Sequence, residues 1–144
     1  MKHLLMMIAV ATLCSVAARA DDKPISFEKL PSAAKQFVNI NFPDAKVLYV
    51  VQDDDLMRPD YAVMLDGGVK IDFSHGGALE KIESEKSGIP EGIVPVQVAD
   101  YVKTHYPDAV ILEYEVDRKG YEVKLSNYME LKFNRGFHLM KIDD

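Results

Sequence analysis

One phrase occurs twice in this chain, and it constrains the fold more than any other feature of the sequence. Residues 41–47 read NFPDAKV and residues 105–111 read HYPDAVI, 64 positions apart. Farther along the offset falls to 60, and YAVMLDGGVKIDFSHGGALEKIE (61–83) runs beside YEVKLSNYMELKFNRGFHLMKID (121–143). The first copy carries four extra residues within DDDLMRPD (53–60). A match of this length predicts two copies of one structural unit.

Each copy opens with a helix signal. Pro31 and Pro95 suit the first helical position, where a missing N–H costs nothing, and Pro43 and Pro107 end the helix a dozen residues later. The side chains between them repeat at helical spacing: Ala34, Phe37, Val38 and Asn41 in the first copy, and Val98, Tyr101, Val102 and His105 in the second. One stripe of each helix is therefore predicted to be buried.

Four short alternating segments follow each helix. In the second copy they are residues 110–117, 121–125, 129–134 and 138–143, separated by turn residues. Their alternation predicts that six side chains face the helix: Tyr121, Val123, Leu125, Met129, Leu131 and Phe133.

The predicted fold class is α+β, with two tandem α-β4 repeats at residues 21–85 and 86–144. SEKSGIPEG (84–92) is the natural joint between them. A repeat of this size buries its surface poorly alone, so we expect one curved antiparallel sheet with both helices on one face. The other face of the sheet would be left open.

The first twenty residues form a predicted secretory signal peptide. A basic start at Lys2 precedes an apolar run too short to span a bilayer, and Ala18 and Ala20 flank Arg19 in an A-x-A signature that predicts cleavage after Ala20. Cleavage would remove Cys14, the only cysteine, so the mature chain would have no disulfide. We expect a periplasmic or secreted protein without a membrane span.

The chain is acidic, with 23 Asp and Glu against 17 Lys and Arg. Nucleic acids and anionic membrane surfaces carry the same sign of charge, so they are excluded as expected partners.

The repeated motifs resemble those of the PepSY-like family of bacterial envelope proteins. The motifs are L-P at the helix start, F-P-D-A at its end, then Y-x-V-x-L, an alternation ending in Phe, and a Gly turn, over residues 25–144. The resemblance implies an envelope location and a fold like that of β-lactamase inhibitory protein, with a curved eight-stranded sheet. It implies function only loosely, because Pro31, Pro43, Asp44, Tyr61 and Phe73 match as helix ends, turns and core.

The candidates for chemistry are few. Asp53, Asp54, Asp55 and Asp60 could hold Ca²⁺, but the spacing of a calcium loop is absent, and a solvated loop is the favoured interpretation. No cofactor or metal is predicted.

Histidines and serines do not form a catalytic pattern either. His105 aligns with Asn41 and is predicted to close its helix, while His75 lies in a turn and His138 in the last strand. Ser74 and Ser126 lie outside any nucleophile motif, so an enzyme is not expected.

The open face of the sheet remains as the candidate site. Alternation assigns ten side chains to it: Tyr49, Val51, Ala62, Met64, Glu113, Glu115, Glu122, Lys124, Glu130 and Lys132. Five of them are predicted to bind a protein partner: Tyr49, Val51, Met64, Glu122 and Lys124. Tyr49 and Met64 would be the anchors, and Glu122 and Lys124 a polar rim.

The expected function is that of an exported module that binds an envelope or extracellular protein and could inhibit it. Two alternatives stay open: a regulator or folding aid of an envelope peptidase, and a protein that binds a small ligand or Ca²⁺.

Overall fold

The computed structural model describes residues 22–53 and 59–144. The predicted signal peptide and Asp54 and Asp55 lie outside these residues. The described elements, in chain order, are β1 (Asp22–Ile25), η1 (Phe27–Lys29), α1 (Ser32–Asn41), β2 (Val47–Asp53), β3 (Asp60–Leu65), β4 (Val69–Phe73), β5 (Leu79–Ser84), α2 (Val96–His105), β6 (Ile111–Val116), β7 (Gly120–Leu125), β8 (Glu130–Asn134) and β9 (Leu139–Asp143).

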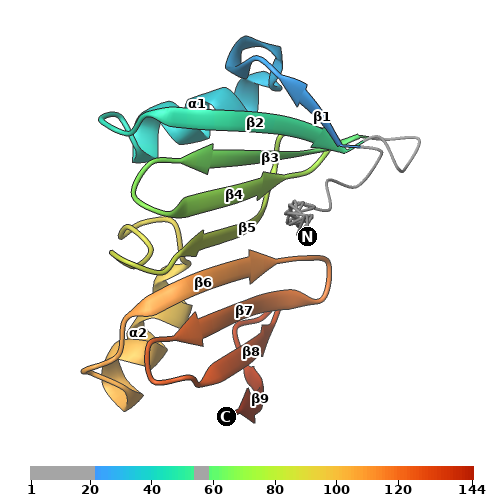
Figure 1. The fold of residues 1–144 in the computed structure, drawn as a ribbon. Helices are drawn as coiled ribbons and strands as arrows, with labels where there is room; N and C mark the ends of the chain where they lie inside the picture. The colour runs from blue at the N-terminus through green and yellow to red at the C-terminus, as the bar shows by residue number, and fades with distance from the viewer. Residues whose placement is uncertain (1–21, 54–58) are drawn as a thin grey trace, which may run out of the picture.

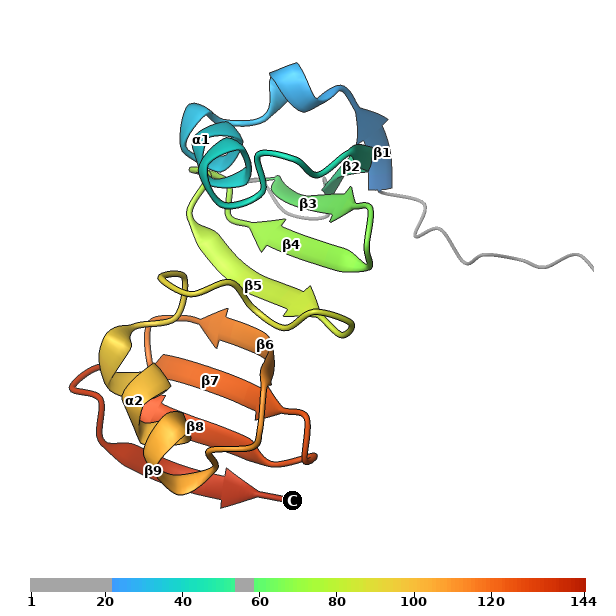
Figure 2. The ribbon, with the colours of Figure 1, turned by 90° about the vertical axis from the view of Figure 1, so that its left-hand side faces the viewer.

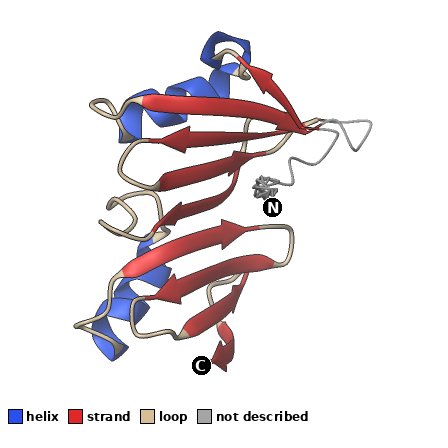
Figure 3. Ribbon diagram, in the orientation of Figure 1, coloured by secondary structure: helices blue, strands red, loops and turns tan. Residues whose placement is uncertain are grey.

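Within the described residues, the strands form one nine-stranded antiparallel sheet whose spatial order is the chain order, from β1 to β9 (Figure 1). The sheet does not close on itself, and α1 and α2 both lie behind it in this view (Figure 3). Turning the molecule shows both helices on the same side of the sheet, as the sequence predicts (Figure 2).

The expected number of strands, eight, is wrong because β1 was not predicted. Its sequence, DKPI, contains Pro24, which has no N–H to donate and weakens any strand pattern. Here Pro24 lies opposite Val51 on an edge strand, where a missing donor is tolerated.

The core lies between the helices and the sheet, and the same contact is built in each half. Ala34 and Val38 of α1 and Val98 and Val102 of α2 are buried, as predicted. The rings of Phe37 and Phe73 pack edge to face with their centroids 5.6 Å apart, and the rings of Tyr101 and Phe133 do so with their centroids 5.4 Å apart. Edge-to-face packing of this kind adds to the stabilisation from burial alone.

The helix ends follow the repeated prolines with one difference. Each helix begins one residue after its proline, so Pro31 and Pro95 are N-cap residues and not the first helical residues. At the other end, Asn41 Nδ2 donates to the carbonyl of Phe37 at 2.9 Å, and His105 Nδ1 donates to that of Tyr101 at 3.0 Å. The prediction that His105 closes its helix is confirmed.

The two halves are joined by pairing of β5 with β6. Lys81 lies opposite Glu115, Ile82 opposite Tyr114, and Glu83 opposite Glu113. Buried residues from both halves belong to a single hydrophobic cluster. The open face therefore continues without interruption across the join.

Candidate functional site

One face of the sheet is left uncovered by the helices. Along β2, Val50 is buried against the helix side while Tyr49 is 52% exposed on the other side. The strand register places the following residues on this open face: Tyr49, Val51, Ala62, Met64, Lys70, Asp72, Lys81, Glu83, Glu113, Glu115, Glu122, Lys124, Glu130, Lys132, Lys141 and Asp143. All ten side chains assigned to the open face from sequence alternation lie there.

Three of the predicted partner-binding residues lie together in the first half. Tyr49 is directly opposite Met64, and Val51 is opposite Ala62. With Pro24 they form the apolar floor of a hollow of about 730 Å³, which we call the β2–β4 hollow. Its polar lining consists of Asp22, Asp53, Asp60, Lys70, Asp72 and Glu80. The hollow thus combines an apolar floor with an acidic rim.

The rim carboxylates repel one another. Burial raises the pKa of Glu80, and the nearby Asp60, Asp72 and Glu115 raise it further. Burial also raises the pKa of Asp72, although Lys70, at 3.8 Å, opposes the shift. Glu80 is at the β-bulge where β5 pairs with β4, and a bulge adds one side chain to a strand at such a point.

Glu122 and Lys124, the remaining predicted binding residues, lie on β7, separated from the β2–β4 hollow by β5 and β6. Both belong to a charged region that extends from β5 to β8 and not to the lining of the hollow. Their part in binding a partner stays a prediction.

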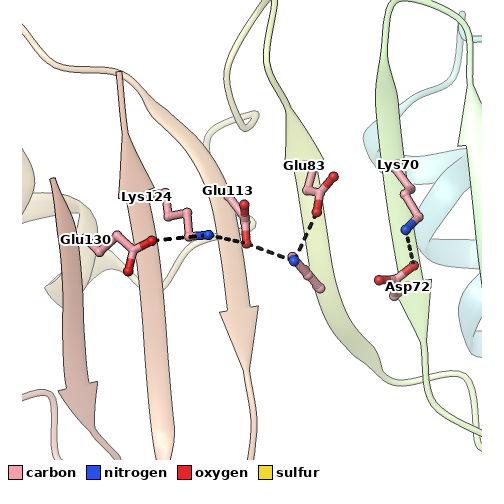
Figure 4. A network of polar contacts seen from close by, with 7 residues as sticks. Lys70, Asp72, Glu83, Glu113, Lys124 and Glu130 are labelled. Carbon is pink, nitrogen blue, oxygen red and sulfur yellow. Dashed lines mark ion pairs between the residues drawn. The ribbon is translucent and has the colours of Figure 1, made fainter. Parts of the chain in front are cut away.

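The charged region is built around a chain of ion pairs across four strands. Lys81 Nζ lies 3.0 Å from carboxylate oxygens of both Glu83 and Glu113. Lys124 Nζ lies 3.7 Å from Glu113 and 3.2 Å from Glu130 (Figure 4). These contacts bridge the join between β5 and β6.

The lysines of this network are held in their charged form. Burial lowers the pKa of Lys81, but hydrogen bonds to Glu113 and Glu83 outweigh that effect and raise it above its ordinary value. The hydrogen bond from Lys124 to Glu130 raises the pKa of Lys124, and the charge of Glu113 adds to the shift. Burial and the neighbouring Glu115 and Glu130 raise the pKa of Glu122, although Lys132 opposes the shift.

Sequence reasoning missed Tyr128, at the turn between β7 and β8. The residue is 88% exposed and has a φ of 70°, a conformation that favours glycine. With Leu112, Glu85 and residues of the ion-pair network it lines a second hollow of about 460 Å³, the β6–β8 hollow. The repeat alignment could have revealed this position, because it places Tyr128 opposite Gly68, a glycine with a φ of 80°.

Apart from His105, the serines and histidines considered for catalysis lie in turns and at strand ends. Ser74 Oγ accepts the N–H of Ala78, and Ser126 Oγ accepts that of Val110. His75 is exposed in its turn, and His138 lies just before β9, not within it as predicted. Across residues 22–53 and 59–144, no three His, Cys, Asp or Glu residues are grouped to hold a metal ion.

No helix in the described part of the chain is long and apolar enough to cross a membrane.

The sequence pattern of a protein family described as "Putative beta-lactamase-inhibitor-like, PepSY-like" matches residues 17–79 and again residues 59–141. The chain belongs to the PepSY-like family. The resemblance inferred from the repeated motifs is thereby confirmed. Among curated proteins, none matches this PepSY-like chain.

Solved structures from Bacteroides are similar to this PepSY-like protein over most of its length. A "putative calcium-regulated periplasmic protein" from Bacteroides thetaiotaomicron is 40% identical, with a TM-score of 0.84 over 86% of this chain and 98% of its own. A "putative periplasmic protein" from Bacteroides vulgatus is 38% identical, with a TM-score of 0.84 over 88% and 99%. A second Bacteroides vulgatus protein is 29% identical, with a TM-score of 0.80 over 85% and 99%.

These relatives are described as periplasmic, in agreement with the localisation predicted from the sequence. The PepSY-like protein is periplasmic or secreted.

Proposed function

We propose that this protein is an exported module that binds another protein on the open face of its sheet. The observation that carries the proposal is the β2–β4 hollow, where Tyr49, Val51 and Met64 form an apolar floor inside a charged rim. Exposed apolar patches rimmed by polar groups are typical of partner sites, and tyrosine is over-represented among the residues that dominate binding energy. Glu122 and Lys124 would contact the partner only if it extends into the second half.

The comparisons support a binding role in general terms. The family description likens its members to inhibitors of an enzyme, and an inhibitor acts by binding. We propose inhibition as one use of the open face, and regulation or folding of an envelope peptidase as the other. We also propose that residues 21–85 and 86–144 arose by duplication, since each contains a helix followed by four strands.

A calcium-dependent role is the second candidate. The 40% identical relative is described as calcium-regulated, and Asp53 and Asp60 border the segment 54–58 that the structure does not describe. Calorimetric titration with Ca²⁺ decides it: a saturable heat that the Asp53→Asn/Asp60→Asn variant loses would favour a calcium site. A trace without saturable heat would eliminate it.

Photo-crosslinking tests the main proposal. A benzophenone amino acid replaces Tyr49 in one protein and Ile40, which is 75% exposed on α1, in the control. Both proteins are expressed in the periplasm of the native host. We expect a defined protein adduct from position 49 and none of the same mass from position 40.

The captured partner is then purified and titrated. Tyr49→Ala should weaken its binding by about 2 kcal/mol because the ring would be a central anchor. The free energy of unfolding should stay nearly unchanged, because half of Tyr49 is already in water. Equal adducts from both positions, or unaltered affinity of Tyr49→Ala, would place the binding site elsewhere.

A further inference from the structure

The open face carries more carboxylates than lysines, and its lysines are largely engaged. Lys81 and Lys124 are bound within the ion-pair network, Lys70 lies 3.8 Å from Asp72, and Lys141 lies 3.2 Å from Asp143. In the described part of the chain, four carboxylates on or beside this face have no ion pair: Asp60, Glu80, Glu85 and Glu115. Glu122 has none either, but it lies opposite Lys132, whose charge opposes the rise in its pKa. The face therefore has unbalanced negative charge distributed over both halves.

Two exposed tyrosines border this charge, one in each hollow. Tyr49 lies in the β2–β4 hollow beside Met64. Tyr128 lies in the β6–β8 hollow with Leu112 and Glu85. Aromatic faces and carboxylates attract the same kind of group, since a guanidinium can stack on a ring while its N–H groups donate to oxygen.

The backbone at Tyr128 indicates that the exposed ring is not required by the fold. The matching turn of the first half uses Gly68 in the same left-handed conformation, and a Cβ there would meet only the side chain of Lys86, at 3.8 Å. A tyrosine in that conformation is strained, and strain of this kind concentrates at functional positions. No ring contact or hydrogen bond involving the Tyr128 side chain offsets it among the described residues.

We propose that the protein partner presents a cationic segment, with arginine or lysine side chains, that lies along the open face between Tyr49 and Tyr128. This inference rests on the proposed function and specifies the chemistry of the partner. Cations from the partner would neutralise the carboxylates that lack an ion pair. They would also reduce the repulsion between Glu80 and its neighbours Asp60 and Asp72, which adds to the effect of burial on the pKa of Glu80. An acidic partner would add to that repulsion wherever it lay along the open face.

Short peptides test the charge preference directly. Three fluorescent peptides of equal length alternate serine with arginine, glutamate or glycine, and ¹⁵N-labelled protein is titrated with each. We expect the arginine peptide to shift amide signals of β2 to β8 around both hollows. The glutamate and glycine peptides should shift none.

Two matched charge-reversal variants test whether the arginine peptide binds at the β6–β8 hollow. Glu85→Lys changes the β6–β8 hollow, while Glu91→Lys makes the same change on an exposed loop beside α2. Glu85→Lys should weaken binding of the arginine peptide by ~3-fold or more at low ionic strength, and Glu91→Lys should not. Shifts that centre on the helix side, or equal losses in the two variants, would overturn the proposal.

The photo-crosslinking experiment separates this inference from the proposed function. A partner captured from position 49 whose crosslinked segment has no lysine or arginine would refute the cationic segment and leave protein binding intact. Absence of any partner at position 49 would refute protein binding at that hollow. Arginine-peptide binding to the open face would in that case still support its preference for cationic groups.

Discussion

At the scale of single residues, Tyr128 and Gly68 adopt the same backbone conformation, but the conformational strain differs between them. Each residue stands at a tight turn, before β8 and β4 respectively, with a φ of 70° and 80°. Glycine adopts such angles readily, whereas a side chain with a Cβ does so under strain. The first half therefore has the more stable turn and the second half displays the larger side chain.

Exchanging the two residues should have opposite effects. Tyr128→Gly should leave the free energy of unfolding unchanged or raise it by up to about 1 kcal/mol, because the strain is relieved. Gly68→Tyr should lower it by about 1–2 kcal/mol, although the site is open enough to admit the side chain. Urea denaturation of both variants measures these changes. A clear loss of stability in Tyr128→Gly would mean that the ring contributes to the fold.

At the scale of secondary structure, the periodic elements could be predicted and the isolated ones could not. The helices and the strands from β2 to β9 each carry several alternating side chains, and the boundaries of β6 to β9 agree with the ranges predicted for the second copy to within a few residues. β1 has only four residues, one of them Pro24, so no pattern identifies it. Tyr128 was missed because a turn has no periodicity that would reveal an exposed side chain.

The ion-pair network could not be predicted because it depends on how the halves meet. The repeat aligns Glu113 with Tyr49 but contains no information about which residue of β5 lies opposite Glu113. That register places Glu83 and Glu113 side by side, with Lys81 between their carboxylates.

Removing the shared cation should weaken the join between β5 and β6. Lys81→Met should lower the free energy of unfolding by about 1 kcal/mol, because like charges directly opposite each other destabilise a strand pair. Adding Glu113→Gln should recover part of the loss, which a double-mutant cycle would measure. Lys141→Met removes an ion pair on the edge strand β9 and should cost less than ~0.5 kcal/mol. A cost for Lys81→Met as small as that of Lys141→Met would contradict a structural role for the network.

At the scale of the whole molecule, the acidic face makes folding stability depend on pH. The pKa values of Glu80 and Glu122 are raised in the folded protein, with burial as the main cause; neighbouring carboxylates add to both shifts, while Lys132 opposes that of Glu122. A carboxyl whose pKa rises on folding stabilises the fold below its ordinary pKa, and this contribution is lost as pH rises through the folded pKa. Acidification from neutral pH toward about pH 5 should therefore favour the folded state at these two positions.

Thermal denaturation across this pH range tests the effect. The Glu80→Gln/Glu122→Gln variant should gain less stability on acidification than the wild-type protein, and the difference should be modest because both carboxyls are largely solvated. Glu91→Gln, on the exposed loop before α2, should behave as the wild type does. If the double variant follows the wild-type pH curve, the carboxylates of the open face do not repel one another as the structure indicates.

The order of the strands has a consequence for export. Every strand after β1 pairs with the strand that precedes it in the chain, so its first neighbour has already been synthesised and exported when it emerges. A polypeptide that leaves a translocation channel with its N-terminal end first could therefore add strands to a growing sheet in the order in which they emerge. Pairings between consecutive segments are also the ones that form fastest, because they close short loops. Two of these connections are long: residues 26–46, through α1, join β1 to β2, and residues 85–110, through α2, join β5 to β6. The second of them makes the β5–β6 join the step at which a half-emerged molecule would pause.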